Sequence, residues 1–144
     1  MKSLKLLGLI AFIICIFSLT ALAGDFDGSR SLLCATMDVV ECVPGGKCQR
    51  VTHDSINAPK FVIINFKENS MSIPGASKNR PPSKIERTES VDGKLILQGA
   101  EDGIEGVRDG LGWTIAISEE TGDMVLSASG DQVGFVVFGA CTPQ

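Results

Sequence analysis

Residues 112–141, GWTIAISEETGDMVLSASGDQVGFVVFGAC, decide the fold of this chain. Two runs in it, 112–118 and 124–129, alternate between apolar and polar residues, which is typical of β-strands with one buried face. The third run, 133–140, is apolar on both sides, as expected of a strand that is buried on both faces. Short turns with the sequences ETGD and GD join the three runs, so the stretch predicts an antiparallel meander.

Further strands are predicted upstream of the meander. Residues 60–67 (KFVIINFK) are rich in β-branched and aromatic side chains, and residues 71–73 are expected to form a short strand. Residues 84–91 and 94–99 flank an Asp-Gly pair, which favours the type I′ turn of a β-hairpin. Together with residues 32–42, these segments bring the expected number of short strands to about eight.

Residues 32–42 (LLCATMDVVEC) are also compatible with a helix, because the stretch contains no glycine or proline. The Val-Val pair and the turn that follows favour a strand. Its alternation predicts one face formed by four residues: Leu33, Ala35, Met37 and Val39.

Three irregular segments separate the strands: a polar one at 49–59, a proline-rich one at 74–82 and an acidic, glycine-rich one at 100–110. The sequence therefore predicts an all-β domain, an antiparallel meander that forms a closed or nearly closed small β-barrel. A two-sheet β-sandwich is the alternative. A barrel of about eight strands is either filled by side chains or holds one small ligand. Filling is the favoured interpretation, with a core expected from Met37, Phe61, Ile63, Phe66, Leu95, Leu97, Trp113, Ile115, Met124, Leu126, Phe135 and Phe138.

The first 23 residues have the pattern of a secretory signal peptide. Lys2 and Lys5 precede an apolar run, and Ala21-Leu22-Ala23 is typical of a cleavage site, so we expect cleavage between Ala23 and Gly24. The mature chain would then be one domain, residues 24–144, periplasmic or secreted and without a membrane span.

The four remaining cysteines are Cys34, Cys42, Cys48 and Cys141, an even number that implies disulfides in an exported domain. Of the three possible pairings, the Pro-Gly turn between Cys42 and Cys48 favours a local bridge there, which leaves Cys34 to pair with Cys141. Because no C-x-x-C occurs, a redox site or a zinc site is not indicated.

The composition argues against nucleic-acid binding. Without Lys2 and Lys5, the chain has 11 basic and 17 acidic residues, which gives a net charge of about −6. Phosphate backbones demand a basic surface. The basic residues of segment 78–87 alternate with Glu86 and Glu89, which indicates a solvated face.

The sequence identifies no catalytic, cofactor-binding or metal-binding residue. His53 is the only histidine, and Thr52-His53-Asp54-Ser55 is expected to form turns in an exposed loop. The acidic residues Glu101, Asp102, Glu105 and Asp109 lack the spacing of a calcium-binding loop, and a solvated loop is the favoured interpretation.

The segments FDGSRSLLCATMDVVECVPGGKCQ and GWTIAISEETGDMVLSASGDQVGFVVFGAC resemble an uncharacterised family of small exported bacterial proteins with four cysteines. That resemblance implies a periplasmic or secreted β-rich domain and supplies no catalytic residues. A looser likeness, of fold alone, is to lipocalin-like barrels and periplasmic lysozyme inhibitors.

Export, disulfides and sparse catalytic equipment favour a non-enzymatic binding or interaction module without a cofactor. Its expected partner is a small apolar ligand in the barrel mouth or a protein at the loops. The alternatives are an inhibitor of a cell-wall enzyme and a hydrolase that uses loop carboxylates. No oligomeric state is predicted.

Overall fold

The computed structural model describes residues 25–76, 80–103 and 106–144. The expected signal peptide therefore lies outside the described residues, as do Lys78 and Glu105. The described residues form nine strands: β1 (Leu32–Cys42), β2 (Gln49–Val51), β3 (Phe61–Asn65), β4 (Ser70–Ser72), β5 (Ser83–Val91), β6 (Lys94–Glu101), β7 (Leu111–Ser118), β8 (Asp123–Gly130) and β9 (Val133–Pro143). No helix in this part of the chain has the length and hydropathy of a membrane span.

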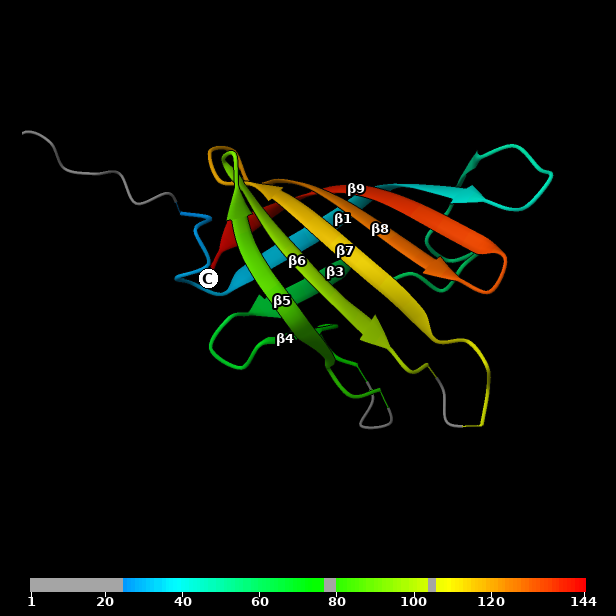
Figure 1. Ribbon diagram of the computed structural model, residues 1–144, viewed down its shortest axis with the longest axis horizontal. Coiled ribbons are helices and arrows are strands. Elements are labelled where there is room, and N and C mark those ends of the chain that lie inside the picture. Colours follow the sequence, from blue (N-terminus) through cyan, green and yellow to red (C-terminus); the bar gives the residue numbers. More distant parts are fainter. Residues whose placement is uncertain (1–24, 77–79, 104–105) are drawn as a thin grey trace, which may run out of the picture.

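The strands form one antiparallel sheet that closes on itself (Figure 1). Strands β3 to β9 follow one another in sequence order, and β9 pairs with β1, which in turn pairs with β3. The result is a closed barrel of eight strands, and β2 adds a ninth strand beside the end of β1. The predicted all-β meander and its closure into a barrel are confirmed, including the three-stranded meander of residues 112–141.

Side chains along the strands point alternately into and out of the barrel, and the inward apolar side chains fill its interior. On β6 and β7, the pairs Leu95–Ile117 and Leu97–Ile115 stand directly opposite each other and are almost fully buried. Burial of such a side chain contributes about 1.5–3 kcal/mol. The buried hydrophobic residues are Leu32, Cys34, Val39, Val62, Ile64, Ile85, Leu95, Leu97, Trp113, Ile115, Ile117, Met124, Val137 and Cys141.

A β-bulge in β1 changes which residues of this strand face the core. The pairing with β9 shifts by one residue between Thr36 and Asp38, so Met37 is the extra residue and is 61% exposed. Cys34 before the bulge and Val39 after it are both buried. The single face predicted for Leu33, Ala35, Met37 and Val39 is therefore wrong, because a bulge reverses the alternation at that point.

Several large apolar side chains expected in the core lie on the outside of the barrel. Phe61 and Phe138 are 50% and 44% exposed, and Ile63 shares the outer face of β3 with Phe61. On β3 the core is formed instead by Val62 and Ile64. Because β3 and β9 are continuous apolar runs, the sequence does not indicate which of their faces points inward. The prediction that β9 is buried on both faces is wrong.

One end of the barrel is closed by the chain that precedes β1. Phe26 and Phe66 pack against the core, and Gly28 lies beside Phe66 and Leu95. Beside them, Gly122 has a φ of 76° and approaches the ring of Phe26, where a side chain would not fit. The residues that precede β1 thus close this end of the barrel through Phe26.

Two disulfides join Cys34 to Cys141 and Cys42 to Cys48, the pairing favoured from the sequence. Cys34 and Cys141 stand directly opposite each other on β1 and β9, with both side chains buried. This disulfide therefore crosses the pair of strands that closes the barrel. The second disulfide closes the short hairpin between β1 and β2.

We predict that the two disulfides contribute unequally to stability. Their cysteines are 107 and 6 residues apart, and by chain entropy the long loop contributes about 4–5 kcal/mol and the short one about 2 kcal/mol. Guanidinium unfolding of Cys34→Ala/Cys141→Ala and Cys42→Ala/Cys48→Ala variants measures both free energies. Equal losses in the two variants would contradict the assignment of barrel closure to the first disulfide.

Candidate functional site

The end of the barrel opposite Phe26 contains a cavity of about 170 Å³. The cavity lies where β1 changes its pairing partner on one edge. Residues 32–35 of β1 pair with β3, and residues 39–41 pair with β2. Between these two pairings, residues 36–38 of β1 have no strand on this edge, and the segment that links β2 to β3 folds over the gap. The rim is completed by Ile73, Ala76, Arg80, Pro81, Glu101 and Leu111, so described residues from each of the three irregular segments line this end.

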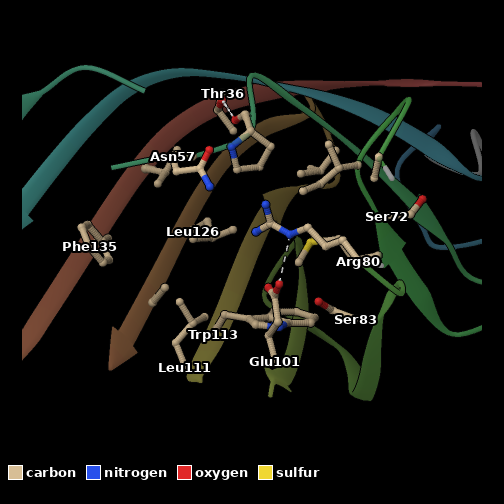
Figure 2. Close-up of a pocket in the computed structure, with 18 of the residues that line it drawn as sticks. Thr36, Asn57, Ser72, Arg80, Ser83, Glu101, Leu111, Trp113, Leu126 and Phe135 are labelled. Carbon is tan, nitrogen blue, oxygen red and sulfur yellow. Dashed lines mark hydrogen bonds and ion pairs between the residues drawn. The ribbon is translucent and has the colours of Figure 1, made fainter. Parts of the chain in front are cut away.

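Most of the cavity wall is apolar (Figure 2). The apolar lining residues are Ile56, Ala58, Pro59, Val62, Met71, Ile73, Ala76, Pro81, Leu111, Trp113, Leu126, Ala128, Phe135 and Val137. The polar lining residues are Thr36, Asn57, Ser72, Arg80, Ser83 and Glu101. An apolar wall with a few polar groups is the usual composition of a small-molecule site.

The indole of Trp113 separates the cavity from the filled part of the barrel. Trp113 stands opposite Gly99 on the neighbouring strand, and its ring lies where a Cβ of residue 99 would be. A glycine is therefore required at position 99 for the ring to adopt this position. One strand pair further in, Leu97 and Ile115 are fully buried.

The indole nitrogen of Trp113 has no hydrogen-bond partner among the described residues. The side chain is only 4% exposed, so bulk water does not compensate for the missing partner. A buried donor without a partner costs about 1–3 kcal/mol. The nitrogen atom itself is buried, so it lies within the packed wall and not at the surface of the cavity.

Arg80 and Glu101 form the charged part of the rim. Arg80 Nε lies 3.4 Å from Glu101 Oε1, and the side chains are 42% and 26% exposed. Figure 2 shows the guanidinium of Arg80 pointing across the cavity toward Asn57 and Leu126. Every second residue of β6 faces the inside of the barrel, as Leu97 and Gly99 do. Glu101 is the next residue in this series, so its carboxylate lies at the mouth.

Thr36 fastens the segment that covers the cavity. Its hydroxyl donates to the carbonyl oxygen of Pro59 (2.6 Å), and its backbone N–H donates to that of Lys60 (3.0 Å). The ring nitrogen Nε2 of His53 lies 2.8 Å from the same hydroxyl oxygen. Because the single hydroxyl hydrogen is used for Pro59, His53 Nε2 must carry a hydrogen and donate it.

His53 therefore has a structural role and is half-buried, whereas the sequence predicted an exposed residue. Its neighbours behave as expected of turn residues. Ser55 donates its hydroxyl and its backbone N–H to Thr52, and Asp54 lies 3.7 Å from Lys60. Thr52, His53, Asp54 and Ser55 are thus engaged separately and form no catalytic triad.

The described acidic residues of segment 100–110 (Glu101, Asp102 and Asp109) are not brought together at the cavity. Glu101 is the only acidic residue among the described residues that line it, while Asp102 and Asp109 are exposed. Within the described ranges, no group of three histidine, cysteine or acidic residues could hold a metal ion. Arg108 of this segment pairs with Asp131 (3.1 Å) on the β8–β9 turn.

Arg80 is the site residue that sequence reasoning missed. The charge alternation of segment 78–87 indicated a solvated face, and this is correct for Lys84 and Arg87, which pair with Glu86 and Glu89 at the surface. Arg80 instead reaches across to Glu101, 21 residues away. The signal available in the sequence was the Pro-Pro pair that follows Arg80, because it separates Arg80 from the strand that contains Lys84 and Arg87.

Comparisons with protein-family models, with curated proteins and with solved structures gave no match for this chain. The resemblance to small exported four-cysteine proteins stays a prediction from the sequence.

We predict that a Cβ at position 99 disrupts the wall of the cavity. It would meet the indole of Trp113 and the backbone oxygen of Lys84, so Gly99→Ala should lower the free energy of unfolding by about 1–3 kcal/mol. Gly112→Ala is the matched control, because no atom lies within 4 Å of its Cβ position on the neighbouring strand. Urea denaturation compares the two variants, and equal stabilities would show that the indole does not occupy this position.

Proposed function

We propose that the protein is an exported, non-enzymatic binding protein that holds one small, mainly apolar molecule in the cavity of the barrel mouth. The observation that carries this proposal is the cavity itself, whose wall is formed mainly by apolar side chains. Antiparallel barrels of eight strands are known to hold one small ligand in this way.

The size of the cavity supports a small occupant. At about 170 Å³ it is slightly larger than an apolar cavity of about 150 Å³ that accepts benzene. A molecule of roughly one six-membered ring fits this volume, whereas lipids and most cofactors are too large for it.

Export is supported by the signal-peptide pattern of residues 1–23 and by the two disulfides. Disulfides persist in oxidising compartments such as the periplasm or the extracellular medium. In such a compartment, the binding protein would meet small molecules that diffuse from outside the cell.

The hydrolase alternative is less well supported. A pair of carboxyl groups with different pKa values would have to face the same cleft, and Glu101 is the only carboxylate that lines the cavity within the described part of the chain. The inhibitor alternative would need a protruding loop. Segment 52–59 is instead fastened across the cavity by Thr36 and His53.

The chain contains one tryptophan and no tyrosine, so its fluorescence reports on the cavity alone. We predict that benzene, added to the disulfide-bonded protein, changes the emission of Trp113 in a saturable manner. Ala128 stands opposite Trp113 on β8 and lines the cavity, so Ala128→Leu should fill the space and abolish this response.

Ser127→Leu is the control for this experiment, because it adds the same side chain on the exposed face of the same strand. It should leave the response unchanged. The absence of a saturable response in the unmodified protein, or an equal response in the Ala128→Leu variant, would refute the proposed function.

A further inference from the structure

Strand β5 has an edge along which no strand of the described chain is paired. Its first two residues, Ser83 and Lys84, pair with β4, and the rest of the strand pairs with β6 alone. Residues 86–91 are exposed, and no backbone hydrogen bond from another described segment reaches them. Figure 1 shows β5 running past the short strand β4 toward its turn with β6. The closure of the barrel between β4 and β5 therefore leaves most of this edge open.

We infer that this edge joins two copies of the protein in a symmetric dimer, in which the two β5 strands pair antiparallel about Thr88. An open strand edge presents unpaired N–H and C=O groups, which are a template for pairing with another strand. In a twofold dimer both copies contribute the same residues. The dimer is independent of the ligand cavity, because none of the described residues 86–91 lines it.

The first step concerns the backbone groups of Thr88 and Ser90, which point away from β6. Residues 92 and 93 have φ of 50° and 70°, so they form a two-residue turn whose flanking residues, Val91 and Lys94, are hydrogen-bonded to each other. Hydrogen-bonded and non-hydrogen-bonded pairs alternate along an antiparallel ladder. Thr88 and Ser90 therefore each present an N–H and a C=O group at the open edge.

The second step concerns the register, which the charges of β5 select. When Thr88 lies opposite Thr88 of the second copy, Arg87 lies opposite Glu89, and the twofold axis forms this favourable contact twice. A shift by two residues would place Glu89 opposite Glu89 of the second copy, which is destabilising. A pairing centred on Ser90 would leave Arg87 beyond the end of the other strand, since β5 ends at Val91.

The third step concerns the charges in the single copy. Arg87 Nη2 lies 2.6 Å from Glu89 Oε1 within the strand, and both side chains are exposed. Charged side chains usually protect an open edge from pairing. Here they do not protect it against a second copy, because the same two side chains are complementary across the twofold axis. The dimer keeps both charges paired and adds backbone hydrogen bonds between Thr88 and its copy.

Sedimentation equilibrium of the disulfide-bonded protein tests the inference, and we expect a concentration-dependent dimer. Arg87→Glu puts a second carboxylate opposite Glu89 and should raise the dissociation constant about tenfold or more. The charge exchange Arg87→Glu/Glu89→Arg restores the complementarity and should restore the dimer. Arg108→Glu is the matched control, because it changes the net charge as Arg87→Glu does and removes an exposed ion pair with Asp131 on the β8–β9 turn. It should leave the dissociation constant unchanged.

A second variant tests the backbone hydrogen bonds. Thr88→Pro removes an N–H at the open edge without removing a hydrogen bond to β6, so it should abolish the dimer and leave a folded monomer, measured by urea denaturation. If Thr88→Pro fails to fold, the charge exchange still decides the question. A protein that stays monomeric up to about 1 mM would overturn the inference. So would a dimer that Arg87→Glu does not weaken, or that the charge exchange does not restore, because the contact would then lie on another face.

Discussion

The antiparallel pairing of β1 with β9 is the interaction on which the rest of the structure depends. Without it the eight strands would form an open sheet with two exposed edges. Ten residue pairs and the disulfide between Cys34 and Cys141 join the two strands. Since β1 is one residue longer than its register with β9 requires, the extra residue Met37 becomes a bulge.

The mouth of the barrel follows from this strand. The other edge of β1 is shared between β3 before the bulge and β2 after it, so a gap remains in the wall. Thr36 lies at the gap and holds the covering segment through Pro59 and His53. The cavity therefore results from the change of pairing partner along β1, from β3 to β2. The indole of Trp113, packed over Gly99, forms the inner limit of the cavity.

Much of the fold could be predicted from the sequence because its signals are local. Alternation in β6 to β8 and the Asp-Gly turn specify those strands, and the Pro-Gly turn between Cys42 and Cys48 indicates the local disulfide. The bulge could not be predicted, because one extra residue in a strand leaves no mark in composition. The outward positions of Phe61 and Phe138 were missed for a related reason, since β3 and β9 are apolar on both faces.

The candidate site was less predictable than the fold, since it depends on contacts between distant segments. The three irregular segments could be recognised in the sequence, but not that described residues from each of them line one end of the barrel. The pairing of Arg80 with Glu101 spans two strands and a segment without regular structure, and no periodicity encodes it. The unpaired N–H of Trp113 is a property of packing, because it arises from the ring position over Gly99.

The central proposal is that the cavity in the barrel mouth binds one small, mainly apolar molecule. A high-resolution crystal structure of the disulfide-bonded protein, purified without refolding and soaked in benzene, tests this most directly. The account predicts electron density for the ring between Leu126 and Trp113. A mouth filled by the protein's own side chains, with no density for the ring, would contradict it.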